Sequence, residues 1–268
     1  MKLGDRMKSY ESRYDQRLLP MVPVLARLDG RAFHSFTSGL DRPFHKGLVE
    51  LMIRTTEQLV EKSNARCGYT QSDEITLVWL SESFDSEIFF GGRLQKMCSV
   101  LSSCATAIFN ESIPGLVPEK AGSLAEFDCR VWQVPTRDEA ANAFVWREQD
   151  AVRNSIQSAA RSIYSDRDCF KKSSSQLQDM LHESGVNWND YPTAFKRGTY
   201  VRFQTIEGEY TAEQIEQLPP LHEARQGKTV RTRRLLVREE FEPITHYRNR
   251  DEVLLDGAEP IRNESESE

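Results

Sequence analysis

The stretch RLDGRAFHSF, residues 27–36, follows a short run of alternating apolar residues. These apolar residues occupy every second position: Val22, Val24, Ala26 and Leu28. The period of two predicts a half-buried β-strand whose opposite face carries Leu25, Arg27 and Asp29. We expect Asp29 to end this strand, because Gly30 permits a sharp bend of the backbone directly after it.

A second acidic segment, SDE at residues 72–74, precedes another strand-like run, ITLVWL at residues 75–80. That run is apolar on both faces, which predicts a central strand covered on both sides. If the two strands are neighbours in one sheet, Asp29 and Asp73 meet at one end of it. Two carboxylates with a free backbone carbonyl make an all-oxygen site that suits Mg²⁺. The pattern alone also fits an ordinary Asp-Gly turn followed by a solvated bend at Asp73 and Glu74.

Composition sets a broad frame. The chain has 268 residues, 38% hydrophobic and 28% charged, which is typical of a soluble globular protein with one large or two small domains. Its net charge of −6 argues weakly against nucleic acid, although a local basic stripe can still bind phosphate. The five scattered cysteines predict reduced thiols in a cytoplasmic protein rather than disulfides or a zinc site. We expect no signal peptide and no membrane-spanning helix.

Helices are expected where apolar residues recur at three- and four-residue steps. The expected helices cover residues 3–14, 45–62, 94 up to Pro114, 136–164 and 173–185. Further strands are expected over residues 127–134, 199–203 and 234–237, and we expect the last two to pair. We expect Gly68 to interrupt regular secondary structure before the strand that begins at residue 75. Thr136 and Glu139 predict a capping box at the start of their helix.

One face of the expected helix 136–164 carries Trp146, Asp150 and Asn154, which lie four residues apart. This face fits either a functional surface or a core tryptophan beside two solvated polar groups. The C-terminal half of the chain concentrates positive charge: Lys171, Lys172, Lys196, Arg197, Lys228, Arg231, Arg233 and Arg234. Aromatic residues lie between these cations, as a phosphate-tracking and base-stacking surface requires, whereas a merely solvated surface is the simpler alternative. Residues 259–268 are expected to form a frayed acidic tail.

Five segments, taken together and in this order, resemble the tRNA-histidine guanylyltransferase family: LGDRMK (3–8), RLDGRAFHSF (27–36), QSDE (71–74), FDCR (127–130) and WREQD (146–150). The resemblance covers roughly residues 1–205. It implies an α+β fold with a palm-like antiparallel sheet and flanking helices, as in nucleotide polymerases, plus a small C-terminal extension. The expected parts are a palm-like catalytic domain (1–165), an RNA-contacting extension (166–255) and an acidic tail (256–268).

The resemblance also implies roles for individual residues. Asp29 and Asp73 match the carboxylate ligands of two Mg²⁺ ions, Gly30 contributes its carbonyl, and Glu74 acts beside them. The matching nucleotide-binding positions are Arg31, Phe33, His34, Arg42, Ser72, Arg93, Lys96 and Asn154. Of these, Arg93 and Lys96 match a basic pair for a second triphosphate, which fits the need of a polyanion for cations. The cations expected to contact RNA are Lys171, Lys172, Lys196 and Arg197.

One departure from the family pattern indicates a subtype. Members that add the extra guanylate to histidine tRNA carry a His-Ile-Asn-Asn motif, where this sequence has VRNS at residues 152–155. Val152 cannot accept a proton or bind a phosphate. A Lys-Pro-Asn-Asp motif of many members likewise reads RPFH at residues 42–45. The sequence therefore resembles the bacterial and archaeal like-protein branch.

That branch implies templated repair of truncated tRNA 5′ ends in the 3′-to-5′ direction. It further implies two Mg²⁺ ions, ATP or GTP as activating and incoming nucleotides, a tRNA partner and a cytoplasmic homotetramer. Three alternatives stay open at this point. They are a dedicated histidine-tRNA guanylyltransferase that adds the extra 5′ G, a nucleotidyl cyclase-like enzyme, and a catalytically silent RNA-binding protein.

Overall fold

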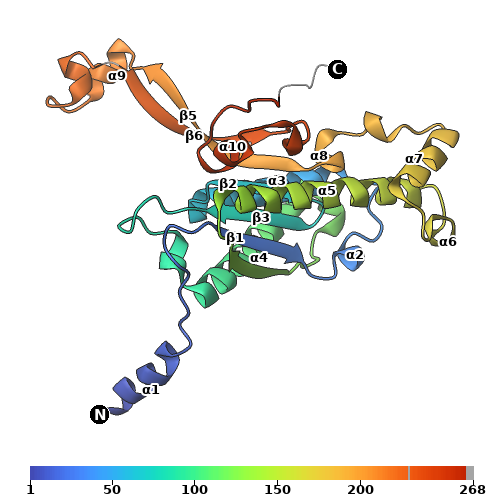
Figure 1. The fold of residues 1–268 in the computed structure, drawn as a ribbon, viewed down its shortest axis with the longest axis horizontal. Helices are drawn as coiled ribbons and strands as arrows, with labels where there is room; N and C mark the ends of the chain where they lie inside the picture. Colours follow the sequence, from blue (N-terminus) through green and yellow to red (C-terminus); the bar gives the residue numbers. More distant parts are fainter. Residues whose placement is uncertain (229, 264–268) are drawn as a thin grey trace.

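Six strands form a single antiparallel sheet in a computed structural model of the chain, which describes residues 1–228 and 230–263, with only the backbone of 231–233. The order of the strands across the sheet is β4-β1-β3-β2-β5-β6 (Figure 1). Their bounds are β1 (Val24–Gly30), β2 (Cys67–Gln71), β3 (Glu74–Trp79), β4 (Phe127–Gln133), β5 (Thr199–Glu209) and β6 (Val230–Glu239).

Helices cover both faces of this sheet (Figure 1). Helices α3 (Lys46–Ser63) and α4 (Leu94–Leu116) pack on one face, and α5 (Arg137–Arg161) and α10 (Arg250–Leu255) pack on the other. The shorter helices are α1 (Leu3–Ser12), α2 (Phe33–Phe36), α6 (Asp166–Cys169), α7 (Ser174–Glu183), α8 (Thr193–Lys196) and α9 (Ala212–Gln217). Five 3₁₀ turns are η1 (Phe89–Gly92), η2 (Pro118–Lys120), η3 (Trp188–Asp190), η4 (Glu223–Gln226) and η5 (Ile244–His246). The expected α+β fold with a palm-like antiparallel sheet is confirmed.

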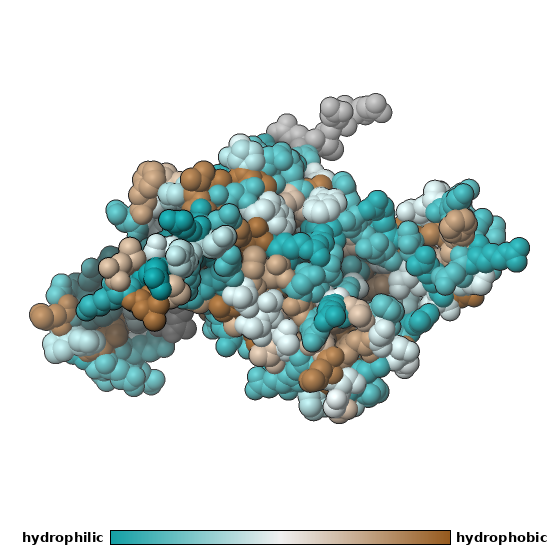
Figure 2. All heavy atoms as spheres, turned by 90° about the horizontal axis from the view of Figure 1, so that it is seen from below, coloured by the Kyte–Doolittle hydropathy of each residue, from teal (hydrophilic) through white to brown (hydrophobic). Residues whose placement is uncertain are grey.

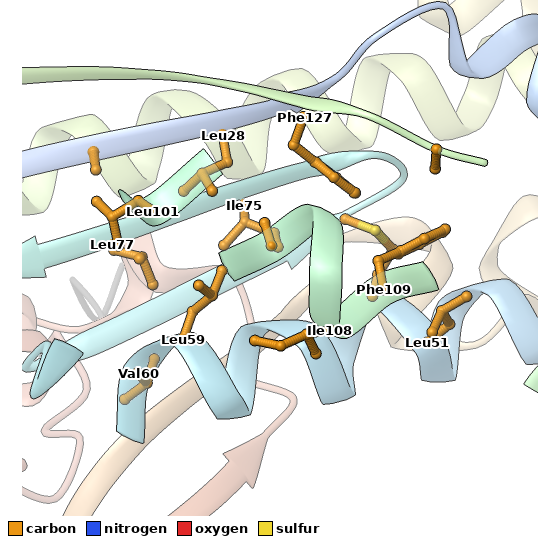
Figure 3. Packing of buried hydrophobic residues seen from close by; sticks show 14 of the residues in the cluster. Leu28, Leu51, Leu59, Val60, Ile75, Leu77, Leu101, Ile108, Phe109 and Phe127 are labelled. Atoms are coloured by element: carbon orange, nitrogen blue, oxygen red, sulfur yellow. The ribbon is translucent and has the colours of Figure 1, made fainter. Parts of the chain in front are cut away.

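The predicted alternation of strand β1 is confirmed by the packing of its two faces, but the strand is not half-buried, because Leu25 on the opposite face is fully buried too. Its residues Val24, Ala26 and Leu28 join the core beneath α3 and α4, whereas Leu25 packs on the opposite side with Phe144 of α5. Figure 3 shows how Leu28 and the β3 residues Ile75 and Leu77 point toward side chains of α3 and α4. Strand β3 lies between β1 and β2 with its last five residues buried, so the predicted central strand is also confirmed. Each such buried aliphatic side chain stabilises the fold by about 1.5–3 kcal/mol.

Two predictions from the sequence about element boundaries were wrong. Gly68 lies inside strand β2, where it pairs with Leu77 and Val201, and the close packing of α3 leaves no room for a side chain there. A Cβ atom at Gly68 would lie 2.6 Å from Val60 Cγ2 and 2.8 Å from Thr56 Cγ2. Pro114 does not end α4, which continues to Leu116. A proline in this last turn removes only one backbone donor, and the packing of α4 on the sheet tolerates that loss.

The predicted pairing of the two C-terminal strands is confirmed, and both strands are longer than expected. Phe203 lies opposite Leu236, and the ladder continues outward to the pair Glu209 and Val230. The outer part of this ladder forms a two-stranded arm that extends from the body and ends at α9 (Figure 1). Its base belongs to the main sheet, because residues 199–202 of β5 pair with β2. The division of the chain at residues 165 and 255 stays a prediction.

The C-terminal segment lies against the body as far as it is described. The backbone amide of Asn263 donates a hydrogen bond to the carbonyl of His246 at 2.8 Å. The guanidinium of the buried Arg202 donates to the carbonyl of Ala258 at 2.8 Å. The expectation of a frayed tail is therefore wrong for residues 259–263, and residues 264–268 lie outside the described part.

The surface in Figure 2 is mainly hydrophilic, with hydrophobic residues in small groups. Helix α1 projects away from the body and contains no buried residue (Figure 1). Within the described ranges, no helix combines the length and the apolar character needed to cross a bilayer.

Candidate active site

The acidic residues predicted to bind metal come together at one end of the sheet. Strands β1 and β3 are antiparallel, with Asp29 opposite Glu74. The turn between β2 and β3 carries Asp73, whose carbonyl accepts a hydrogen bond from the amide of Gly30 at 3.0 Å. On the other side of β1, Asp128 of β4 is also opposite Asp29. Because directly opposed residues share one face of a sheet, Asp128, Asp29 and Glu74 form a row of carboxylates.

Asp73 lies in a setting that favours a bound cation. Burial raises the pKa of Asp73, the negative charge of Asp29 raises it further, and a hydrogen bond from Ser72 opposes this shift. The Ser72 hydroxyl donates to Asp73 Oδ1 at 3.0 Å, and Ser72 has a left-handed backbone with φ of 56°. A divalent cation between the carboxylates of Asp73 and Asp29 would offset both the free-energy cost of burying a negative charge and the repulsion between the two charges.

The ligand set fits Mg²⁺ that is shared with a phosphate. Asp29, Asp73 and the Gly30 carbonyl offer oxygen ligands, and Mg²⁺ is commonly bound through one or two carboxylates plus substrate phosphates and water. Among the residues that the structure describes, no group of three or more His, Cys, Asp or Glu side chains forms a complete metal centre. The remaining ligands would therefore come from a substrate triphosphate and from water.

Glu74 differs from Asp73 because its carboxylate forms ion pairs with arginine side chains. Its carboxylate forms an ion pair with Arg147 of α5, and Arg27 Nε lies 3.9 Å from Glu74 Oε1. Arg27 also lies 3.7 Å from Asp29 Oδ2, so it links the two acids. Burial raises the pKa of Glu74 although both guanidinium groups oppose that shift. Glu74 therefore positions its neighbours rather than offering free oxygens to a metal.

The ion pairs continue along helix α5. Arg147 is only 7% exposed in its side chain and also contacts Asp150 at 2.6 Å. Asp150 in turn pairs with Arg153. Charges therefore alternate from Asp29 through Arg27, Glu74, Arg147 and Asp150 to Arg153. The sequence reasoning did not identify Arg27, Asp128 and Arg147 as site residues, although strand alternation and the WREQD segment contained the signal.

A pocket of about 660 Å³ opens beside the acidic residues. Seven of the predicted site residues line it: Gly30, Phe33, His34, Arg42, Ser72, Asp73 and Asn154. Its volume lies in the range of sites for small molecules and nucleotides. Phe33 is 4% exposed, and a Cβ on Gly30 would lie 2.2 Å from the Phe33 ring. Gly30 is thus required for this packing, and Phe33 can reach a ligand mainly through its backbone.

Helix α5 supplies further pocket residues that the sequence reasoning missed. Gln157, Ser158 and Arg161 line the pocket together with Asn154. The Ser158 hydroxyl donates to the carbonyl of Pro43 at 3.0 Å and so fixes the loop that forms the opposite wall. Continuing the three- and four-residue steps from Asn154 along the helix predicts Ser158 and Arg161 as neighbours on that face.

Three predicted nucleotide-binding residues lie outside this pocket. Arg31 is 74% exposed in its side chain and pairs with Glu126 at 2.7 Å. Arg93 and Lys96 lie at the start of α4, where Arg93 Nε donates to Asp15 at 2.9 Å. The backbone directly before Arg93 contacts the segment that leads into β1, since the amide of Leu18 donates a hydrogen bond to the carbonyl of Gly92. The acids lie at the other end of β1, and seven strand residues span about 20 Å.

The cations predicted to contact RNA have different environments. Lys171 and Lys172 are exposed, and Arg197 is half-buried with its guanidinium 5.8 Å from the Trp188 ring. Lys196 is 9% exposed, its amine donates to the Asn189 carbonyl, and burial lowers its pKa. Because that amine is used inside the chain, the structure does not present Lys196 to RNA.

The other basic residues of the C-terminal half are also partly engaged. Lys228 pairs with Glu223 at 2.7 Å. Arg234 lies over the Phe203 ring at 3.8 Å and donates to Asn64. The side chains of Arg231 and Arg233 lie outside the described part. No continuous basic stripe can therefore be assigned to the described residues of β6.

Comparisons with known proteins agree with this geometry. Residues 4–135 match the family model described as tRNAHis guanylyltransferase. A bacterial tRNA(His) guanylyltransferase (Thg1)-like protein solved in complex with ATP is 38% identical, with a TM-score of 0.70, covering 76% of this chain and 87% of that chain. A bacterial protein of the same description in complex with GTP is 34% identical, with a TM-score of 0.68, covering 91% and 94%. A probable tRNA(His) guanylyltransferase of Bos taurus is 26% identical over 264 residues, covering 88% of this chain and 85% of its own.

The palm-like sheet, the paired acids and these similarities define a nucleotidyltransferase that acts on tRNA. The chain belongs to the tRNAHis guanylyltransferase family, within its like-protein branch.

Proposed function

We propose that this protein is a Mg²⁺-dependent 3′-to-5′ polymerase that adds templated nucleotides to the 5′ end of truncated tRNAs. The observation that carries the proposal is the pocket of nucleotide size that is lined by Gly30 and Asp73, with Asp29 directly before Gly30 on β1. The ATP and GTP complexes of the similar bacterial proteins support nucleotide use at such a site.

The residues at this site have distinct proposed roles. Asp29, Asp73 and the Gly30 carbonyl would hold two Mg²⁺ ions. When bound, Mg²⁺ supplies charge neutralisation at the phosphates and activation of the attacking hydroxyl. Arg42 and His34 line the pocket wall where a triphosphate needs donors. Glu74 keeps its place through Arg147, so the turn that carries Asp73 is held rigidly against helix α5.

The environment of Val152 favours templated repair over addition of a fixed guanylate. Its side chain packs against the apolar cluster that contains Ile156, Leu177 and Trp188. It is not among the residues that line the pocket. The position therefore contributes to packing and offers no polar group to read a guanylate, so specificity would come from pairing with the opposite strand. The alternative is a histidine-tRNA guanylyltransferase that adds the extra 5′ G.

The test is the identity of the nucleotide added to a tRNA that lacks its first nucleotide. With Mg²⁺ and all four nucleoside triphosphates, changing the opposing base from C to U should switch the preferred addition from G to A. Addition of G against either base would overturn templated repair in favour of the guanylyltransferase alternative. Conversion of nucleotide without any RNA would favour a cyclase. RNA binding without any addition would favour a silent binding protein.

We also propose a cytoplasmic homotetramer. Arg93 and Lys96 lie beside the segment that precedes β1, at the opposite end of this strand from the acids, so we infer that they serve a triphosphate at the site of a neighbouring subunit. Helix α1 exposes Leu3, Met7 and Tyr10 on one face and buries no residue, as expected for a surface that a neighbouring subunit covers. All five cysteines are free thiols, which is typical of a reducing compartment.

A further inference from the structure

Trp146 has an unusual environment for a tryptophan so close to a buried ionic network. Its side chain is 48% exposed, whereas Trp79 and Trp188 are 2% and 6% exposed. It is therefore not the core tryptophan that the sequence left as an alternative. The guanidinium carbon of Arg147 lies 4.6 Å from the centre of the Trp146 ring. A cation at this distance from an indole ring is attracted to its face, so Arg147 holds the exposed ring in place.

Trp146 lies on the same helix, α5, that forms one wall of the pocket, but outside the pocket itself. Asn154 lines the pocket, and Asp150 joins the ionic network at the next turn toward the N-terminus. Trp146 follows one further turn along the same face, because residues four apart share a face. The eight residues from Asn154 to Trp146 span about 12 Å along the helix axis. Along this face of α5 the pocket therefore comes first, the ionic network that contains Asp150 and Glu74 comes next, and the exposed indole of Trp146 comes last.

The reaction proposed above joins a nucleotide to the 5′ end of an RNA at the acids. If the nucleotide occupies the pocket, the RNA end would approach the acids from the side away from the pocket, and Trp146 lies on α5 beyond the ionic network in that direction. This step rests on the proposed function. The base at the end of an RNA helix has one face without a stacking neighbour, and an aromatic side chain can cover that face.

We propose that the exposed indole of Trp146 is a stacking platform for the nucleobase at the 5′ end of the substrate RNA. Stacking on an aromatic ring tolerates every base, because each base has a π face. This property suits an enzyme that takes its sequence information from the template strand. Arg147 links the platform to Glu74, so the position of the RNA end is tied to the turn that carries Asp73.

The experiment measures RNA affinity and intrinsic tryptophan fluorescence of the full chain at fixed salt, with each probe added separately so that the RNA titrations contain no nucleoside triphosphate. Three probes are compared: an acceptor-stem RNA hairpin, the same hairpin with an abasic 5′-terminal residue, and ATP alone. The variants are Trp146→Ala and Trp146→Phe, with Trp132→Phe as the control for the other partly exposed tryptophan.

The intact hairpin should quench the fluorescence, and the abasic hairpin should not. Trp146→Ala should weaken binding of the intact hairpin by about tenfold and leave the abasic hairpin nearly unchanged. Trp146→Phe should keep most of the affinity, and Trp132→Phe should keep the quenching.

Equal affinities of Trp146→Ala and the parent protein for both hairpins would overturn the proposal. Quenching by ATP without quenching by RNA would also overturn it, since the platform would then serve a free nucleotide. A protein with base-dependent quenching that adds no nucleotide would refute the proposed function and leave the stacking site supported.

Discussion

Arg147 and Glu74 form an ion pair that ties helix α5 to the catalytic end of the sheet. Arg147 is almost completely buried and also contacts Asp150. The pair determines where the turn with Asp73 lies relative to the pocket wall on α5. Two elements separated by more than 70 residues in the sequence thus form one rigid site through a single guanidinium group.

Replacing Arg147 should disturb both stability and catalysis. Arg147→Met removes the nearer cation of Glu74 and one of the two partners of Asp150, both partly buried, which should lower the free energy of unfolding by about 3 kcal/mol. Nucleotide addition should fall as well, because the turn with Asp73 loses its support. Urea denaturation and the rate of addition measure the two effects. Arg153→Met is the matched control, since its side chain is 64% exposed and it should change stability by less than about 1 kcal/mol. Equal effects of the two substitutions would refute the positioning role.

Asp29→Ala and Asp73→Ala should each reduce nucleotide addition by about a hundredfold or more, because each removes a charge needed at the developing phosphate. Both variants should stay folded, since neither carboxylate supports the core. Single-turnover rates on a 5′-truncated tRNA measure the loss of nucleotide addition. Mn²⁺ binding followed by magnetic resonance measures the loss of metal affinity. Asp138→Ala on the exposed start of α5 should leave both measurements unchanged. Near-normal addition by either folded active-site variant would refute the metal assignment.

Glu148 should make stability depend on pH. Burial raises its pKa, although hydrogen bonds from the Tyr200 hydroxyl and the Ile244 amide oppose the shift. A raised folded-state pKa means that the contribution to stability is largest below the unfolded value of about 4.3 and is lost as pH rises through the folded pKa. Glu148→Gln has no carboxyl proton to lose, so its stability lacks this dependence on pH. The free energy of unfolding of Glu148→Gln relative to wild type should therefore rise as the pH increases from about 4.3 through the raised folded-state pKa of Glu148.

Urea denaturation at several pH values measures this difference. Glu111→Gln, at an exposed position of α4, provides the control and should show a nearly constant difference. A difference for Glu148→Gln that did not change with pH would contradict the prediction.

The oligomer should depend on the apolar face of α1. Met7→Glu introduces a charge at the centre of the face formed by Leu3, Met7 and Tyr10, so it should dissociate the tetramer. Ser9→Glu adds the same charge elsewhere on the exposed helix and should leave the assembly intact. Analytical ultracentrifugation at micromolar concentration measures both. A wild-type monomer whose activity is unchanged by dilution would rule out the tetramer.

Local sequence patterns were sufficient to predict most of the elements, whereas the roles assigned to the site residues stay predictions. The alternation from Val24 to Leu28, the apolar run from Ile75 and the helical spacing after Thr136 each predicted an element that the structure contains. The carboxylates at Asp29 and Asp73 were predicted to meet at one sheet end, and the strand register places them there. Such features can be predicted from the sequence because the periods of strands and helices are only two to four residues long, so a short segment contains several repeats.

Tertiary structure decided what depends on residues far apart in the chain. Gly68 belongs to a strand because it pairs with Leu77 of β3 and with Val201 of β5, which is 133 residues away in the sequence. Lys196 is buried because the preceding turn provides the Asn189 carbonyl and the Trp188 ring, and because Ser155 of α5, 41 residues away in the sequence, donates to the Lys196 carbonyl. Periodicity within a segment records which face of that segment is apolar. It does not record which other segment covers that face, and strand pairing, burial of charge and the partners of Glu74 all depend on that choice.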